Sequence, residues 1–109
     1  MSYSGMILPF KIDCDTLTPE DWKCLAWKVS GLVAPFGIVE GVSRGGCPLA
    51  YWLKPYKTKS SLSLLIVDDV LSTGQSMEAQ RAGRKAMGVV IFARGLCPKW
   101  ITPLFQMHQ

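Results

Sequence analysis

Two adjacent carboxylates, Asp68 and Asp69, stand between a run of apolar residues and a turn rich in hydroxyl groups and glycine. The segment reads LLIVDDVLSTGQS from Leu64 to Ser76. Neighbouring carboxylates accept hydrogen bonds from a pair of sugar hydroxyls, or hold a hydrated magnesium ion. The turn consists of Ser72, Thr73, Gly74, Gln75 and Ser76. Because it leads into a predicted helix whose first N–H groups favour a phosphate, we expect the segment to bind a ribose 5-phosphate.

A second glycine turn lies upstream and is made of Ser43, Arg44, Gly45 and Gly46. Glycine lets the backbone approach a ligand closely, and the arginine supplies a positive charge. The chain carries 12 Lys and Arg against 8 Asp and Glu, a formal net charge of +4. Three of these cations cluster at Lys54, Lys57 and Lys59, and we expect them to form a solvated loop. The placement of Arg44 within the glycine turn predicts an anion site there.

Helical and strand patterns alternate along the chain. We expect helices over 18–32, 48–53 and 76–85, and strands over 37–42, 62–70 and 89–93. The run from Leu64 to Val67 lacks polar alternation, which indicates a strand covered on both faces. The order predicts an α/β fold of three layers, with a mostly parallel sheet flanked by helices and right-handed crossovers. Binding sites in such sheets lie beyond the carboxyl ends of the strands, where both glycine turns fall.

Length and composition narrow the classes of protein. A chain of 109 residues predicts a single domain over 1–109. No apolar run approaches the roughly 18 residues that a membrane span needs, and the first residues do not form a secretory signal. We therefore expect a cytoplasmic protein. No continuous basic helix and no basic strip interleaved with aromatic residues is present, so we do not expect nucleic acid as a partner. A nucleic-acid binder is the weaker alternative, and its salt-sensitive affinity would rest on Lys54, Lys57 and Lys59. Exposed sheet edges and tryptophans favour a homodimer.

The segment from Leu64 to Ser76 resembles the thirteen-position signature of the type I phosphoribosyltransferases. The segment VSRGGCPLA from Val42 to Ala50 resembles the pyrophosphate-binding loop of the same family. From Thr18 to Leu53 the chain is similar to the xanthine-guanine branch, with the tripeptide LAW followed by SRGG. These segments lie between Thr18 and Ser76. The resemblance implies the α/β fold expected above.

The resemblance also implies a ligand and a role for each residue. The ligand would be phosphoribosyl pyrophosphate (PRPP), bound with Mg²⁺. Asp68 and Asp69 would hold the ribose hydroxyls, and through them or through water the metal, while the turn at 72–76 would hold the 5-phosphate. The turn from Ser43 to Gly46 would hold the pyrophosphate. In the reaction of the family a nucleobase displaces pyrophosphate at the anomeric carbon, which makes Asp68, Asp69 and Arg44 the candidate catalytic residues.

Three features depart from the family pattern. Family enzymes carry an extra strand and a long mobile lid before the signature strand, where this chain has only KPYKTKSSLS over 54–63. Purine-using relatives place an acid where this chain has Ser72, and a serine cannot act as a carboxylate base. The base-covering hood would come from 6–12 or 98–107, where Trp100 and Ile101 resemble the tryptophan-containing tail of the xanthine-guanine branch.

Two functions remain open on the sequence. The first is a phosphoribosyltransferase that transfers the sugar phosphate to a nucleobase or related amine. The second is a non-catalytic regulator or sensor that kept the PRPP cradle and lost the closing lid. Segment 54–63 and the hood distinguish them, because an enzyme must keep water away from the electrophilic sugar.

Overall fold

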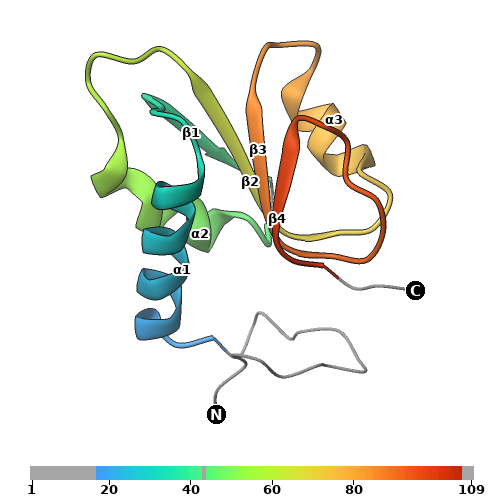
Figure 1. Cartoon of the computed structure of the whole chain (residues 1–109), viewed down its shortest axis with the longest axis horizontal. Coiled ribbons are helices and arrows are strands. Elements are labelled where there is room, and N and C mark those ends of the chain that lie inside the picture. The colour runs from blue at the N-terminus through green and yellow to red at the C-terminus, as the bar shows by residue number, and fades with distance from the viewer. Residues whose placement is uncertain (1–16, 43, 107–109) are drawn as a thin grey trace.

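The computed structural model describes residues 17–42 and 44–106. Four parallel strands form one sheet in the order β1-β2-β3-β4 (Figure 1). The elements are α1 (Pro19–Leu32), β1 (Ile38–Gly41), α2 (Cys47–Leu53), the 3₁₀ turn η2 (Lys54–Tyr56), β2 (Leu64–Leu71), α3 (Gln75–Arg81), β3 (Met87–Ala93) and β4 (Ile101–Gln106). The predicted α/β class and parallel sheet are thereby confirmed.

Helix α1 begins where the sequence pattern places it. The Thr18 hydroxyl accepts a hydrogen bond from the Asp21 N–H at 3.2 Å, and the Asp21 carboxylate accepts one from the Thr18 N–H at 2.9 Å. This reciprocal capping box satisfies two N–H groups that would otherwise lack helical partners. The apolar face of the helix, which includes Trp22, Ala26 and Val29, is buried against the sheet.

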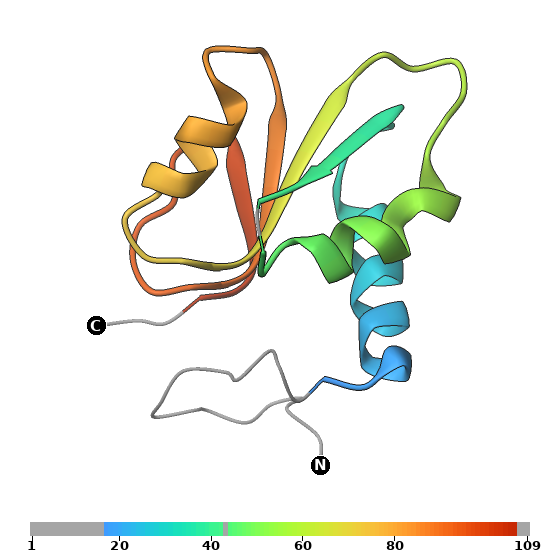
Figure 2. The same ribbon diagram turned by 180° about the vertical axis from the view of Figure 1, so that it is seen from behind.

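The sheet is covered on both faces, as the uninterrupted apolar run in β2 predicts. Leu65 and Val67 pack with α1 and α2 in one core cluster, and Ile66 packs with Met77 of α3 in the other. Successive side chains of a strand point to opposite faces, so α1 and α2 cover one face and α3 the other. Figure 2 shows α3 separated from α1 and α2 by the sheet. These are the three layers that the sequence predicts.

Two elements differ from expectation. Helix α3 ends at Arg81 rather than at residue 85, because Ala82 and Gly83 adopt left-handed backbone angles with φ of 53° and 78°. The last strand, β4, was not predicted at all, since Pro103 lies in its middle. Proline removes a donor from a strand, and it is accepted here because β4 lies at the edge of the sheet.

The two crossovers that precede β2 and β3 have opposite hands. Strand order advances in one direction from β1 to β3, yet α2 crosses one face and α3 the other. Two connections that advance the same way over opposite faces cannot both be right-handed, so the prediction of right-handed crossovers throughout was wrong. The reason is that α2 buries Leu49 and Leu53 in the cluster that already contains α1. Right-handed crossovers are otherwise the strong rule.

Over residues 17–42 and 44–106, no helix is long and apolar enough to cross a bilayer.

An ion pair ties the edge strand β1 to the turn after α3. The carboxylate of Glu40 accepts hydrogen bonds from the Arg84 guanidinium at 2.8 and 2.9 Å, and one from the Gln80 amide at 2.9 Å. These donors lower the pKa of Glu40 from 4.5 to about 2. The bond network connects residues more than 40 positions apart and fixes α3 over the sheet.

We predict that Glu40→Gln lowers the free energy of unfolding by about 1 kcal/mol at pH 7, since the pair is partly exposed. A depressed pKa gives stability that is present above pH 4.5 and is lost as the pH falls toward 2. The deficit should therefore shrink between pH 5 and pH 2.5 in chemical denaturation. Glu20→Gln is the control, because Glu20 is exposed and lies 3.8 Å from Lys23. Equal losses in both variants would contradict the role of this ion pair.

Candidate functional site

The upstream glycine turn lies at the carboxyl ends of β1 and β2. The Val42 N–H donates to the Val67 carbonyl at 2.9 Å, which continues the pairing of β1 with β2 for one more residue. The Gly46 N–H then donates back to the Val42 carbonyl at 2.8 Å and closes the upstream turn. That turn therefore lies beside the residues that precede the acid pair.

Glycine is required at both turn positions by close approach to β2. A Cβ on Gly46 would lie 2.2 Å from the Val67 carbonyl oxygen and 3.0 Å from the Asp68 Cα. A Cβ on Gly45 would lie 2.5 Å from the carboxyl atoms of Asp69. The first contact is with rigid backbone and the second with a side chain. The upstream turn is thus packed directly on the acids, as a site built from both segments requires.

The two acids occupy different environments. Asp68 is buried, with 8% of its surface exposed, and Asp69 is half-buried. Each carboxylate accepts a hydrogen bond from the next backbone N–H, at 2.8 Å for Asp68 and 2.7 Å for Asp69. Burial, together with the hydrogen-bonded carboxyl of Asp69, raises the pKa of Asp68 from 3.8 to about 7. Near neutral pH the Asp68 carboxyl is therefore protonated part of the time.

The turn after β2 encloses a small polar cavity of about 30 Å³. Its lining includes Asp68, the turn residues Ser72, Thr73, Gly74 and Ser76, and apolar groups from β2 and α3. Gly74 has a φ of 84°, a left-handed conformation that favours glycine. Ser72, Thr73, Gln75 and Ser76 are exposed, and the Gln75 N–H is held by the Thr73 hydroxyl at 3.3 Å. Asp68 and the hydroxyl-rich turn thus line one cavity.

The remaining predicted residues do not all lie beside the two acids. Arg44 is exposed in the upstream turn. Ser43, and residues 6–12 of the predicted hood, lie outside the described residues. The structure does not bring Trp100 and Ile101 to the acids: the Trp100 indole donates to Glu78 of α3 at 2.9 Å, and Ile101 is buried in the core. Their contact with a base stays a prediction, and we leave them out of the site.

One neighbour of the site was missed by the sequence analysis. The Arg94 N–H, at the carboxyl end of β3, donates to the Leu71 carbonyl at 3.0 Å. This bond joins the segment after β3 to the turn after β2. The sequence feature that could have identified Arg94 is its position, because it is the first charged residue after a buried strand.

The acids fit a metal ion only in company with a ligand. In the part of the chain that the structure describes, no three His, Cys, Asp or Glu side chains gather around a common point. Two adjacent carboxylates are too few for a dedicated cation cage, but Mg²⁺ commonly takes one or two carboxylates plus substrate oxygens and water. The donor set therefore matches a magnesium ion that arrives with a phosphorylated ligand.

The sheet, its layers and the two turns at the strand ends define a phosphoribosyltransferase-like α/β fold. A solved structure with this fold is the xanthine-guanine-hypoxanthine phosphoribosyltransferase of Helicobacter pylori. It is 18% identical to this chain, covers 78% of it and 85% of its own length, and superposes with a TM-score of 0.52. At that identity the likeness concerns the fold. No family model matches the sequence, and no curated protein matches it.

The raised pKa of Asp68 predicts a pH-dependent stability. An acid whose pKa is higher in the folded than in the unfolded chain stabilises the fold at low pH. For Asp68 this stabilisation is fully present below pH 3.8, the pKa in the unfolded chain, and is lost as the pH rises through about 7. Asp68→Asn keeps an acceptor for the Asp69 N–H but carries no charge. We expect the free energy of unfolding of the variant to exceed that of the parent by on the order of 2–4 kcal/mol at pH 8, and by much less at pH 4. A gain of equal size at both pH values would contradict the assignment.

The contacts of the glycine turn predict unequal effects of alanine. Gly46→Ala should lower the free energy of unfolding by at least about 2 kcal/mol, because its Cβ meets backbone. Gly45→Ala should cost less, because the Asp69 side chain can move. Gly31→Ala in α1 is the control, since no atom lies within 4 Å of its Cβ. Thermal melts of the three variants test this order, and a Gly46→Ala variant as stable as Gly31→Ala would refute the close packing.

Proposed function

We propose that the chain binds phosphoribosyl pyrophosphate with Mg²⁺ and transfers the 5-phosphoribosyl group to a nucleobase or related amine, with release of pyrophosphate. The observation that carries the proposal is the contact of the Gly45 turn with the Asp69 carboxyl. This contact brings together the two segments that the family resemblance assigns to different parts of the same ligand. The phosphoribosyltransferase-like fold supports the same ligand class.

Each part of the cradle would have a distinct task. Asp69 and Asp68 would accept hydrogen bonds from the two ribose hydroxyls, and Arg44 with the glycine N–H groups would neutralise the pyrophosphate. The turn at 72–76 would hold the 5-phosphate. Bound Mg²⁺ would supply positive charge to the departing pyrophosphate. In the transfer, the bond from the anomeric carbon to pyrophosphate breaks, a bond to the acceptor nitrogen forms, and that nitrogen loses its proton.

A second candidate is a non-catalytic PRPP sensor. The observation that favours it is the connection from α2 to β2, which contains only the turn η2 and no strand over 54–63. A short connection leaves no segment long enough to fold over the sugar and exclude water. Both candidates share the PRPP cradle and differ in what happens after binding.

We expect calorimetric titration with PRPP and Mg²⁺ to give saturable binding, weakened at least tenfold in Asp69→Asn. Glu20→Gln, an exposed change on α1, is the matched control and should bind as the parent does. Because Asp68 has a pKa of about 7, affinity should rise between pH 6 and pH 8 as the Asp68 carboxyl ionises. Equal affinities in the parent and Asp69→Asn, or no heat with either, would remove the proposal.

A separate assay distinguishes the enzyme from the sensor. Pyrophosphate release is measured across a panel of purine and pyrimidine bases and small amines. Release with one acceptor that is lost in Asp69→Asn supports the transferase. Binding of PRPP without release from any member of the panel assigns the sensor.

A further inference from the structure

The positive charge of the chain is concentrated in one segment. Between Glu40 and Asp68 the sequence contains no acid and four cations, namely Arg44, Lys54, Lys57 and Lys59. The other eight cations of the chain equal its eight acids in number. The whole net charge of +4 therefore corresponds to this stretch, which contains α2, η2 and the segment that follows.

Aromatic rings lie among these cations on the surface. Tyr51 and Trp52 of α2 pack edge to face with ring centroids 5.4 Å apart. The Lys54 ammonium lies 5.5 Å from the centre of the Tyr51 ring, and the Lys23 ammonium of α1 lies 5.7 Å from that of Trp52. Tyr51 is 60% exposed and Tyr56 38%. We name this surface the basic aromatic face; it consists of Lys23, Tyr51, Trp52, Lys54, Tyr56 and Lys57.

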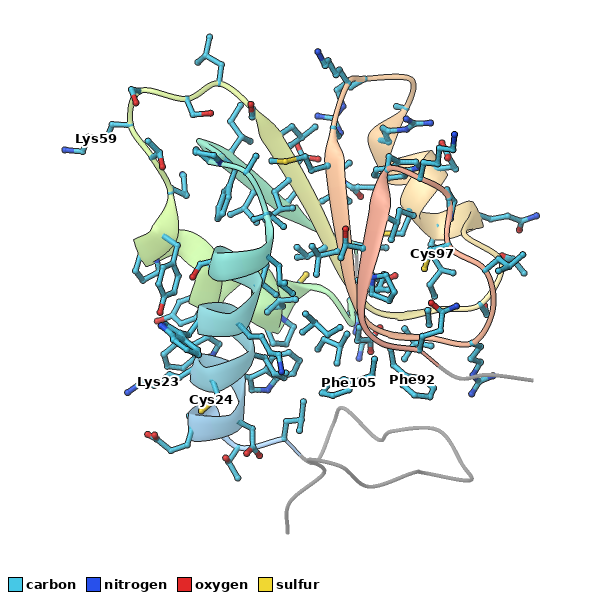
Figure 3. All side chains as sticks on the ribbon, in the orientation of Figure 1. Lys23, Cys24, Lys59, Phe92, Cys97 and Phe105 are labelled. Atoms are coloured by element: carbon cyan, nitrogen blue, oxygen red, sulfur yellow. The ribbon has the colours of Figure 1, made fainter. Side chains whose placement is uncertain are left out.

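The face lies away from α3, on the side of the molecule that α1, α2 and η2 form. Figure 3 labels Lys23 and Lys59 on that side. The chain of contacts from Lys23 through Trp52 and Tyr51 to Lys54 makes the face continuous. The Lys57 N–H donates to the Lys54 carbonyl at 3.2 Å, which holds the next turn against it. None of the six residues of the face is acidic, and among the residues that the structure describes Glu20 lies 3.8 Å from Lys23.

Charge and ring exposure together select the kind of partner. A second copy docked by two-fold symmetry would place lysines against lysines, which is repulsive. An anionic partner is required, and exposed tyrosine rings favour one that offers flat π-faces for stacking. Single-stranded nucleic acid has both properties along its whole length, whereas stacked duplex bases are hidden.

We infer that the basic aromatic face binds single-stranded nucleic acid, with the lysines contacting phosphates and Tyr51 stacking on a base. A lysine that now covers one side of a ring can swing to a phosphate while the ring receives a base. The inference goes beyond the proposed PRPP function and does not rest on it, because Asp68, Asp69 and the turn at 72–76 are not part of the face.

The test measures fluorescence anisotropy of a labelled single-stranded 20-nucleotide RNA of mixed sequence, titrated with the full chain from 50 to 300 mM salt. With about three phosphate contacts, log K should fall with log salt at a slope of about −2. Lys54→Gln/Lys57→Gln should reduce that slope by about 1.4 in magnitude. Tyr51→Ala should weaken binding about tenfold without changing the slope of log K against log salt. Tyr51→Phe keeps the ring and should bind as the parent does.

Matched controls separate the face from general charge. Lys85→Gln/Lys99→Gln removes the same charge from exposed positions elsewhere and should leave most of the affinity. Asp69→Asn should bind RNA as the parent does, so that loss of PRPP binding and loss of RNA binding are distinguishable. Circular dichroism melts verify that each variant is folded.

Four outcomes would overturn the inference. These are equal losses in the two double-lysine variants, no effect of Tyr51→Ala, tighter binding to the duplex of the same sequence, and capture by vesicles with 30% anionic lipid in preference to the RNA. The last result would assign the same face to a membrane surface instead.

Discussion

The candidate site depends on the absence of side chains at Gly45 and Gly46. Their Cα atoms lie so close to the end of β2 that a Cβ would overlap the Val67 carbonyl or the Asp69 carboxyl. This packing places Arg44 and the acid pair on one surface, although the residues are separated by more than 20 positions. Backbone hydrogen bonds from the N–H groups of Val42, Gly46 and Cys47 hold the turn in this position. The arrangement therefore depends on the small size of the two glycines.

Electrostatics then gives the acid pair its character. A buried carboxylate next to a second carboxylate is costly to ionise, and the pKa of Asp68 rises to about 7 as a result. Glu40 is the opposite case on the neighbouring strand, because Arg84 and Gln80 donate to it and lower its pKa to about 2. The fold thus pairs Glu40 with Arg84 to fix α3 over the sheet, and it places two adjacent acids at the carboxyl end of β2.

The short connection between β1 and β2 shapes the rest of the molecule. Without a further strand in this connection, β1 becomes an edge and α2 lies beside α1 rather than on the opposite face. One crossover of unusual hand follows from that placement. The same connection presents Tyr51, Lys54 and Lys57 to solvent, where a longer segment would otherwise cover or separate them.

The sequence by itself determined the class of fold and pointed to the candidate residues. Apolar runs and caps predicted α1, β2 and the layered parallel sheet, because the repeat of a helix or strand is local and is written in consecutive residues. The acids and the two glycine turns were also identified from local spacing. Tertiary structure decided the rest: the contact of Gly45 with Asp69, the pKa of Asp68, the strand β4 around Pro103, and the packing of Trp100 on α3. Those properties depend on which distant residues share a space, and no local pattern specifies that.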